Sequence, residues 1–539
     1  MRMAIIYGIA ISLLSLATPI SVQLLINSVA NTALPAPLFT LSMILLILLL
    51  IFVALSACRI HLMALFERRL FARIVAEITL RAVHAQNPFF NDERRGDLFN
   101  RYFDLITVQK AIPSLLIGGF AILLQAAVGL AVTSFYHPFF LTFNLLLVFC
   151  IWLIWQLGVG GGVRTAVGLS HAKHDAARWL ESVGSSNGFY KSHRHLSFAM
   201  DRSDAMTAAY VAAHRHHFRY TFTQNIAFML LYAVASAALL ALGGWLIIQN
   251  QLSIGQLVAA ELILSGVFYG ISQLGIYVES FYDLAGSLEE LSLLYAIPQE
   301  RSAGHEGRRP RDGSVRLRNV AFGEDRFDFE LDSGERLVAV ADPGADHAVA
   351  LLLKRHVHPD RGMVIVGGAD LEALDMYLLR SDVTVLDRPS IVEVTIREYL
   401  RLAQPDAPPA AVMDVIALVG LETRIAQLPE GLDTMLSASG SPLLIDEVMA
   451  LKLAAALLRR PRVLMLSPLY DMLPKACLTA ALDQLRTSET TVLLFSNRPE
   501  EIVLDGYLWL GRKRQERVAN PEALAARTGG VEVNDALPR

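Results

Sequence analysis

A group of histidines in the middle of the chain has the first spacing that could do chemistry. Two pairs, His171 with His174 and His214 with His217, lie three residues apart, so each pair shares one face of a helix. Such spacing can hold Zn²⁺. Lysine and arginine alternate with these histidines and disfavour a bound cation. We therefore predict a solvated polar face here, and no metal site.

One acidic residue lies within a long apolar stretch. Glu261 falls in residues 253–284, which are apolar enough to cross a bilayer. An ionisable residue in such a span is a functional candidate by default. It could line a substrate cavity, carry a proton, or lie hydrated near the outer mouth of a cavity. The last role is the simplest of the three.

The glycine run and the cysteines indicate packing. The run Gly158–Gly162 (GVGGG) would loosen a helix or allow close helix contact. It is not a phosphate loop, since no strand precedes it and no Lys-Ser/Thr pair follows. The cysteines, Cys58, Cys150 and Cys477, are far apart. Their spacing excludes a disulfide framework and a CxxC-type metal site.

Length and composition limit the class of protein. The chain has 539 residues, enough for two to four domains. Hydrophobic residues make up 54% and charged residues 18%, whereas a soluble protein carries about 25% charge. A purely soluble or disordered chain is therefore disfavoured. The formal net charge of −4 argues against a nucleic-acid partner.

The apolar excess is concentrated in the first 290 residues or so. Six stretches there could each span a bilayer, namely 4–28, 38–66, 112–135, 138–160, 224–250 and 253–284. The first could also be a secretory signal, but the spans that follow favour a membrane helix. The longer connections, 67–111 and 161–222, are rich in arginine. The positive-inside rule places them and both termini in the cytoplasm, and near-helical spacing over residues 67–86 extends the preceding helix.

Two breaks in these connections carry aromatic residues. Pro88 is followed by Phe89 and Phe90, and a Gly/Ser/Asn turn is followed by Phe189 and Tyr190. An exposed aromatic turn on an arginine-rich helical stalk is a suitable docking point for another domain. An ordinary turn is the equally open alternative.

The second half of the chain has a different pattern. Residues 299–313 are charged and contain Gly and Pro, which is typical of a linker. Short β-branched runs then alternate with helical stretches, which predicts an α/β domain with a parallel sheet. The predicted strands are 336–341, 383–386, 462–466 and 491–495. We divide the chain into a membrane domain of six helices (1–298), a linker (299–313), an α/β domain (314–517) and a C-terminal tail (518–539).

The order of these landmarks resembles an ABC exporter half-transporter of the peptide and haemolysin-type group. The phrases that carry the resemblance include LATPISVQLLINSV (16–29), RRGDLFNRYFDL (94–105), LSIGQLVAA (252–260), HPDRGMVIVGGADLEAL (358–374), LPEGLDTMLSASGS (428–441) and ALLRRPRVLML (456–466). The resemblance covers nearly the whole chain. It implies a dimer in the bilayer, with a membrane α-helical bundle followed by an ABC-type nucleotide-binding domain.

The residues that match the family's phosphate loop differ from its pattern. A phosphate loop needs glycines, a lysine for the terminal phosphates and a Ser/Thr for Mg²⁺. In the matching stretch, which begins at Ala341, Gly344 is the surviving glycine, while His347 and Ala348 replace the lysine and the hydroxyl. Asp346 adds a negative charge, which at ~5 Å and an effective dielectric constant of ~20 repels each phosphate charge by about 3 kcal/mol.

The other family motifs are altered in the same way. The Mg²⁺-binding Asp and the catalytic Glu align with Ser467 and Pro468, and proline has no group that could accept a proton. The glutamine and the switch histidine align with Asp387 and Asn497. The LSGGQ signature aligns with Leu443, Leu444, Ile445, Asp446 and Glu447.

We therefore predict an ABC-exporter-like, multi-pass protein of the bacterial inner membrane whose nucleotide-binding domain is a pseudo-ATPase without catalytic residues. It would take part in export of a peptide, polypeptide or lipid-like substrate. No cofactor is expected, and ATP with Mg²⁺ would bind only if the degenerate pocket still accepts it. Its partners would be the lipid bilayer, a second half-transporter in a homodimer or heterodimer, and a periplasmic adaptor. An ATP-driven subunit with an intact ABC partner, and a non-transporting membrane scaffold, are the alternatives.

Overall fold

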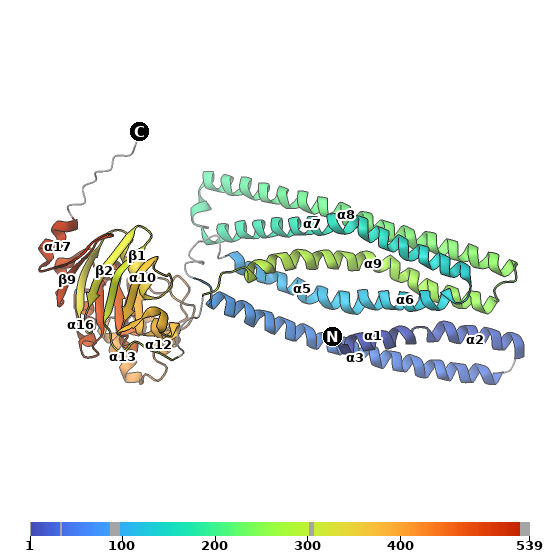
Figure 1. Cartoon of the computed structure of the whole chain (residues 1–539), viewed down its shortest axis with the longest axis horizontal. Helices are drawn as coiled ribbons and strands as arrows, with labels where there is room; N and C mark the ends of the chain where they lie inside the picture. The colour runs from blue at the N-terminus through green and yellow to red at the C-terminus, as the bar shows by residue number, and fades with distance from the viewer. Residues whose placement is uncertain (1, 33–34, 87–96, 301–306, 529–539) are drawn as a thin grey trace. The chain divides into compact units, whose positions relative to one another are not determined.

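The computed structural model describes residues 2–32, 35–86, 97–300 and 307–528. The chain divides into two units, Met1–Gln299 and Glu300–Arg539. The first unit consists of helices, and the second combines helices with two β-sheets (Figure 1). This confirms the predicted class, an α-helical membrane bundle followed by an α/β domain. The finer limits of the linker and the tail stay predictions.

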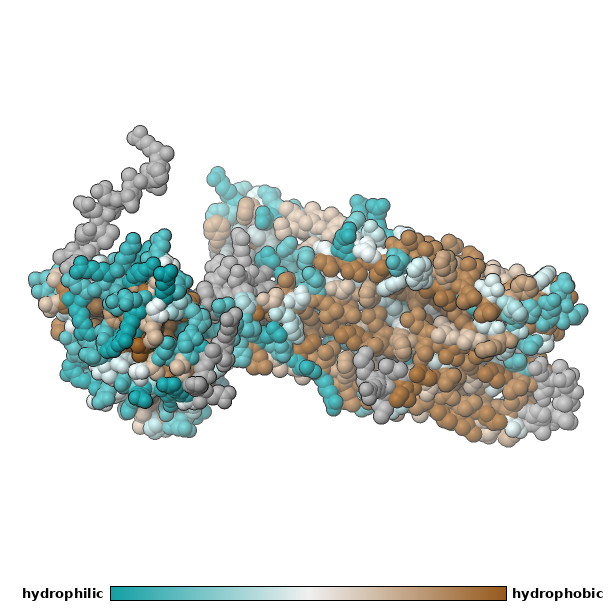
Figure 2. All heavy atoms as spheres, in the orientation of Figure 1, coloured by the Kyte–Doolittle hydropathy of each residue, from teal (hydrophilic) through white to brown (hydrophobic). Residues whose placement is uncertain are grey.

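Long helices make up the first unit. They are α1 (Arg2–Leu14), α2 (Ala17–Thr32), α3 (Pro35–Val83), α5 (Asp104–Pro113), α6 (Phe120–Ser134), α7 (Pro138–Ser185), α8 (His193–Ile248) and α9 (Ile254–Tyr295). Shorter turns are η2 (Asp97–Phe103), the π-helix η3 (Ser114–Gly119) and η4 (Phe189–Lys191). Within the described residues, six helical stretches are long and apolar enough to cross a membrane. Figure 2 shows apolar residues gathered over the middle of these helices.

The helices extend well beyond the thickness of a bilayer. α7 has 48 residues, so it is about 72 Å long at 1.5 Å per residue. That is more than twice the ~30 Å hydrocarbon core. α3 likewise continues past its apolar segment to Val83, as the helical spacing over residues 67–86 predicts. The first predicted span differs, because it is divided into α1 and α2.

Local sequence signals explain where two of these helices begin. Pro138 occupies the first turn of α7, and the His137 ring accepts a hydrogen bond from the Phe139 N–H at 3.2 Å. At α9, the Ser253 hydroxyl accepts from the Gln256 N–H at 3.1 Å, and the Gln256 side chain accepts from the Ser253 N–H at 2.9 Å. This is a reciprocal cap that fixes the α8–α9 turn.

The glycine run of α7 brings helices close together. A Cβ atom at Gly158 would lie 1.8 Å from the Gln224 amide nitrogen, and one at Gly161 would lie 2.2 Å from the Tyr220 ring. Gly162 meets the Tyr282 ring of α9 in the same way, at 2.2 Å. The run therefore serves close packing of α7 against α8 and α9, which is one of the two roles that the sequence left open.

Buried charged groups tie the polar ends of these helices. Asp104 is 1% exposed, and its carboxylate pairs with Lys173 at 2.6 Å and with His174. Glu290 is fully buried and pairs with Arg101. His174 and also His217 are less than a tenth exposed. The predicted solvated face is therefore wrong for these two histidines, because His174 contacts the Asp104 carboxylate and His217 lies 2.9 Å from the Thr165 hydroxyl inside the bundle.

The structure describes one of the two predicted aromatic turns, the one with Phe189 and Tyr190. Phe189 and Tyr190 lie in η4, where the Phe189 ring stacks on His195 at 4.1 Å and Tyr190 meets the edge of Trp179 at 6.1 Å. Phe189 remains 59% exposed. The turn is therefore an ordered aromatic knob, and its docking role stays a prediction. The other turn, with Pro88, Phe89 and Phe90, lies outside the described residues.

The second unit contains two sheets. The strands are β1 (Val315–Phe322), β2 (Asp325–Leu331), β3 (Arg336–Ala341), β4 (Arg361–Val366), β5 (Ala369–Asp370), β6 (Val383–Leu386), β7 (Val463–Leu466), β8 (Thr491–Phe495), β9 (Gly506–Leu510) and β10 (Gln515–Val518). The larger sheet has the order β10-β9-β3-β8-β7-β6, parallel except for β10. It contains every strand that the sequence predicts. The smaller antiparallel sheet, β2-β1-β4-β5, was not predicted.

Helices complete the second unit. They are α10 (Ala345–Leu353), α11 (Met376–Asp382), α12 (Ile396–Ala403), α13 (Pro409–Leu418), α14 (Glu422–Gln427), α15 (Ile445–Arg459), α16 (Lys475–Arg486) and α17 (Pro521–Thr528), with short turns η5 (Leu371–Ala373), η6 (Gly431–Asp433), η7 (Pro468–Met472) and η8 (Pro499–Glu501). α10 packs into a core shared by both sheets, whereas α12, α13, α15 and α16 pack on the parallel sheet.

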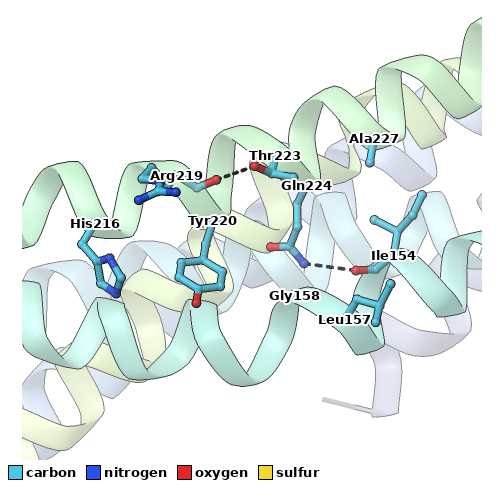
Figure 3. Close-up of a pocket in the computed structure, with 9 residues that line it drawn as sticks. All are labelled: Ile154, Leu157, Gly158, His216, Arg219, Tyr220, Thr223, Gln224 and Ala227. Carbon is cyan, nitrogen blue, oxygen red and sulfur yellow. Dashed lines mark hydrogen bonds between the residues drawn. The ribbon is translucent and has the colours of Figure 1, made fainter.

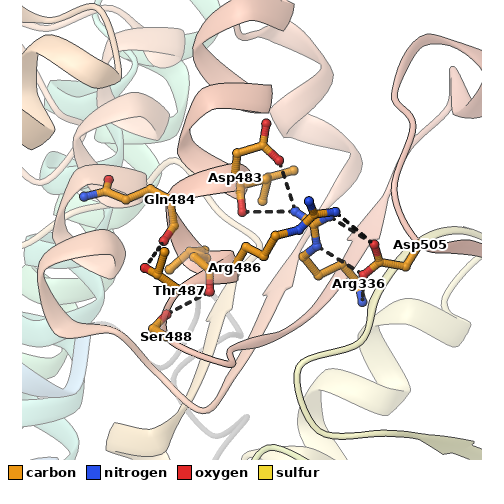
Figure 4. A network of polar contacts seen from close by, with 9 residues as sticks. Arg336, Asp483, Gln484, Arg486, Thr487, Ser488 and Asp505 are labelled. Atoms are coloured by element: carbon orange, nitrogen blue, oxygen red, sulfur yellow. Dashed lines mark hydrogen bonds and ion pairs between the residues drawn. The ribbon is translucent and has the colours of Figure 1, made fainter.

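A buried arginine at the beginning of β3 forms a network of ion pairs (Figure 4). Arg336 is 3% exposed. Its guanidinium donates to the Asp505 carboxylate at 3.0 and 3.2 Å and to Asp483 of α16 at 3.2 Å. Arg486 pairs with Asp505 from the outer side at 3.5 Å. This network fixes one end of β3, and the other end leads into the candidate site.

Candidate functional site

The loop between β3 and α10 has the strand–turn–helix form of a phosphate loop. Gly344 has a φ of +86° and caps α10, a conformation that favours glycine. The Ala345 N–H donates to the Asp342 carbonyl at 3.0 Å, and the Ala348 N–H donates to the Gly344 carbonyl at 2.9 Å. The surviving glycine therefore keeps the shape of the turn, independently of the residues that follow it.

A small cavity lies beside this turn. Its volume is about 130 Å³. Its lining residues are Asp346, His347, Ala350, Val385, Asp387, Arg388, Met465 and Ser467. The fold thus brings together His347, Asp387 and Ser467, which the sequence assigns to one pocket. Ala341, Gly344, Ala348, Pro468 and Asn497 were assigned to the same pocket and do not line this cavity.

The cavity is small and carries mixed charge. Ligand pockets usually have about 300–1,000 Å³, so this volume is far below that of a nucleotide site. Asp346 and Asp387 supply carboxylates, and the Arg388 guanidinium lies 3.7 Å from the Asp387 carboxylate. None of the described lining residues is a lysine. The single arginine is thus already shared with an acidic neighbour, which weakens it as a phosphate ligand.

A half-buried lysine holds the loop after β6. The Lys452 ammonium of α15 donates to the Ser390 carbonyl at 3.3 Å and also to the Arg388 carbonyl. Burial lowers the pKa of Lys452. This contact fixes the loop that carries Asp387 and Arg388 to α15.

Asp471 joins the segments that follow β7 and β8. The sequence motifs did not indicate this residue. The Asp471 carboxylate accepts the Ser496 hydroxyl and the Asn497 N–H, both at 2.8 Å. The Ser467 hydroxyl caps η7 by accepting from the Leu469 N–H at 3.4 Å. The Ser467 hydroxyl and the backbone N–H of Asn497 therefore both take part in hydrogen bonds within the protein. Asp471 lies in the phrase LSPLYD, where its acidic side chain was the available signal.

Another internal contact closes the loop after β3. The Asp342 carboxylate accepts the Arg512 N–H at 3.0 Å. The Arg512 guanidinium in turn pairs with Asp325 at 2.5 Å. These bonds anchor Asp342 to the β9–β10 turn, so its negative charge stays close to the phosphate-loop-like turn.

The residues aligned with the signature form the N-terminus of α15. Leu443 is buried, whereas Leu444 and Ile445 are 64% and 56% exposed. The Glu447 carboxylate accepts the Leu444 N–H at 2.8 Å and pairs with Arg424 at 3.1 Å. A helix N-terminus attracts anions, and here the anion is the helix's own glutamate. Asp446 is exposed in the same turn.

Two further predictions concern metals and Glu261. Among the described residues, no group of three or more His, Cys, Asp or Glu side chains could hold a metal ion. Glu261 is exposed on α9, near the end that follows Ser253. Its role, whether in a cavity, in proton transfer or as a hydrated residue, stays a prediction.

Known proteins resemble this chain along most of its length. Leukotoxin translocation ATP-binding protein LktB of Mannheimia haemolytica is 24% identical over 475 residues, covering 85% of this chain and 66% of that protein. The LktB protein of Bibersteinia trehalosi matches with the same identity and coverage. The matched stretch therefore spans just under two thirds of these relatives. No family model matches the chain.

A solved structure shares the fold. The structure of a bacterial Atm1-family ABC exporter with ATP bound superposes with a TM-score of 0.82 at 17% identity, covering 99% of this chain and 98% of that one. At such low identity the likeness concerns the fold.

Proposed function

Since this chain has the architecture of an ABC exporter half-transporter, with a transmembrane domain followed by a nucleotide-binding-type domain, we propose that it is a pseudo-ATPase member of that architecture. In this proposal the second unit neither hydrolyses ATP nor holds Mg²⁺. It instead stabilises one arrangement of the membrane helices. The exposed aromatic turn at Phe189 and Tyr190, and the turn with Pro88, Phe89 and Phe90, would dock the two units.

One observation carries the proposal. His347, which the resemblance aligns with the phosphate-binding lysine, lines a cavity of about 130 Å³ together with Asp346 and Asp387. A triphosphate placed there would meet two negative charges, each unfavourable by about 3 kcal/mol at ~5 Å and an effective dielectric constant of ~20. Arg388 offsets part of this repulsion. Pro468 replaces the base that would activate water.

Internal contacts support the same reading. Glu447 caps the signature helix, Asp342 is held by Arg512, and Lys452 holds the loop after β6. In an ATP-driven domain, the corresponding loops must be free to exchange contacts with the nucleotide. Here the chain's own charged groups occupy them.

The resemblance to ABC exporters, which work as dimers in the membrane, supports a dimer for this chain. We propose a homodimer or a heterodimer in the bacterial inner membrane, with both termini cytoplasmic. In either pairing this chain would present a glutamate-capped signature to the partner's phosphate loop. The relatives' printed name concerns translocation of a leukotoxin, so a peptide or polypeptide is the first substrate class to test, followed by a lipid-like molecule. A periplasmic adaptor would receive it.

The direct test uses the full chain reconstituted in lipid nanodiscs. Binding of a fluorescent ATP analogue and release of phosphate are measured with Mg²⁺ in excess. We expect no saturable binding below millimolar nucleotide, and phosphate release equal to that of empty nanodiscs. Phosphate release that disappears on changing His347 or Asp387 would overturn the proposal, after contaminating ATPases have been removed.

A second arm separates the alternatives. The chain is co-reconstituted with an intact ABC half-transporter from the same genome, and phosphate release is measured again. ATP turnover that requires both chains would favour the ATP-driven alternative. Transport into proteoliposomes without turnover would support the proposal, and a lack of transport under every gradient would favour the scaffold.

A further inference from the structure

A pocket between α7 and α8 is not explained by any of these roles. It has a volume of about 430 Å³ (Figure 3), within the usual range for ligand sites. Its lining residues are Ile154, Leu157, Gly158, His216, Arg219, Tyr220, Thr223, Gln224 and Ala227. It lies within the first unit, so it is separate from the degenerate nucleotide pocket.

The pocket has one cationic end and one aliphatic end. Figure 3 shows His216 and Arg219 toward one side, and Ile154, Leu157 and Ala227 toward the other. Arg219 is exposed, and within the described residues its guanidinium makes no ion pair. An accessible arginine without an acidic partner is available to an anion.

The cationic and aliphatic ends of the pocket lie on either side of the point where the uncharged segments of α7 and α8 begin. Residues 220–248 of α8 carry no charged side chain, and residues 138–163 of α7 carry none either. Arg219 is therefore the last charge before the apolar part of α8. This change of composition predicts that the Arg219 guanidinium lies at the level of the lipid head groups and that the aliphatic end of the pocket extends into the acyl-chain region.

The glycine run of α7 makes room for this site. Gly158 and Gly161 allow Gln224 and Tyr220 to lie against the α7 backbone. The Gln224 amide donates to the Ile154 carbonyl at 3.4 Å and accepts from the Tyr282 hydroxyl at 2.7 Å. The Gln224 amide is thus bonded within the protein, and Arg219 and His216 are the basic side chains that the pocket offers to a ligand.

We propose that this pocket binds an anionic phospholipid, with its phosphate on Arg219 and His216 and part of an acyl chain along Ile154, Leu157 and Ala227. Basic pockets between membrane helices at the cytoplasmic side select anionic head groups. The arginine-rich extensions of the same helices predict that this end faces the cytoplasmic leaflet, where anionic lipids are concentrated. A bound lipid would join α7 to α8 at the point where both leave the bilayer.

The test measures lipid retained by the purified full chain. Native mass spectrometry compares phosphatidylglycerol with phosphatidylcholine of the same acyl chains, at several salt concentrations. We expect phosphatidylglycerol to be preferred, and the preference to weaken as salt screens the charge. Arg219→Gln should lower retention about fivefold, which corresponds to ~1 kcal/mol per cation near an anionic membrane surface.

Matched variants distinguish the site from general charge. Arg215→Gln, one helical turn away and outside the pocket, should retain lipid as the parent does, and Arg219→Lys should retain most of it. Ala227→Phe fills the aliphatic end, so it should weaken lipid binding while leaving the cationic end unchanged. Equal loss in Arg215→Gln, or no loss in Arg219→Gln, would overturn the site.

Soluble anions distinguish the source of the phosphate. Inorganic phosphate and glycerol 3-phosphate are added as competitors at millimolar concentration. We expect neither to displace phosphatidylglycerol, because both lack the chain that contacts Leu157 and Ala227. Full displacement by either anion would replace the lipid assignment with a small-anion site, and equal retention of phosphatidylcholine would overturn both.

Discussion

The Leu444 N–H donates to the Glu447 carboxylate at 2.8 Å, so α15 carries an anion at its own N-terminus. Arg424 holds the same carboxylate from the side and also donates to the Pro442 carbonyl at 2.8 Å. These contacts stabilise the first turn of α15.

Glu447→Ala should destabilise the second unit by about 1 kcal/mol, the usual effect of removing a helix N-terminal cap. Hydrogen exchange of the first turn of α15 should become faster, with little change elsewhere. Glu447→Gln keeps an acceptor and should recover part of the protection. Asp446→Ala changes an exposed acid in the same turn, and an effect as large as that of Glu447→Ala would contradict the cap.

A change of charge in the cavity should raise the affinity for Mg-ATP without producing ATP hydrolysis. The double change Asp346→Gly with His347→Lys removes one negative charge and adds a positive one beside the turn at Gly344. We expect Mg-ATP binding to strengthen at least tenfold, because the repulsion of about 3 kcal/mol per carboxylate is partly removed. Turnover should stay at background, since Pro468 cannot accept a proton.

The matched control for this change is Glu372→Gln with His358→Lys. The His358 ring and the Glu372 carboxylate form an exposed contact at 2.7 Å on the same unit, and with histidine counted as neutral the two double changes alter the net charge by the same amount. Nucleotide binding should not change in this control. Equal gains in both variants would mean that overall charge, and not the cavity, determines binding.

The sequence predicts the large elements of this protein because periodic patterns determine them. The strands at 336–341 and 491–495 are short, mostly apolar runs that contain β-branched residues; the second is buried along its whole length and the first over most of it. The turn at Gly344 needs a positive φ that glycine supplies. The antiparallel sheet was missed although β2 alternates exposed with less exposed residues along its whole length. Its partner β1 alternates only in part, so the pair gives a weaker signal than two regular strands would.

The side-chain partners could not be predicted in the same way. Glu447 caps Leu444, but leucine is not a capping residue, so the usual signal is missing. Asp104 meets Lys173 and His174 across 70 residues of chain, a pairing that depends on how α5 and α7 pack. Arg388 could have been found, since it directly follows Asp387 and shares its loop.

Breaking the Arg336–Asp505 ion pair at the beginning of β3 should destabilise the second unit more than any substitution at its surface. Asp505→Asn leaves the buried Arg336 guanidinium without its main partner. Since a hydrogen bond to a charged group contributes about 1.5–3 kcal/mol, we expect a loss of about 2–3 kcal/mol in the free energy of unfolding. Arg486→Gln is the control from the same network, because Arg486 is 68% exposed and an exposed pair contributes at most about 1 kcal/mol. Equal losses of unfolding free energy in the two variants, measured by chemical denaturation, would show that the Arg336–Asp505 pair has no special role in stability.

The stability of the second unit should depend on pH through His356. Burial, with the positive charges of Arg380 and Lys354, lowers the pKa of His356 to about 4. An unfolded histidine titrates near pH 6.5, so between these values the unfolded chain binds the extra proton. Stability should therefore fall as the pH decreases from about 6.5 toward 4.

His356→Gln should flatten this part of the pH profile, because the neutral amide cannot be protonated. His358→Gln is the matched control, since that ring is 53% exposed and pairs with Glu372 at 2.7 Å. The measurement is the unfolding midpoint of the full chain at pH steps between 7 and 4.5. Depressed acids such as Asp505, whose pKa is lowered by Arg336, lose their contribution only below this window. A profile of His356→Gln that still falls as steeply as that of the parent would show that another group controls it.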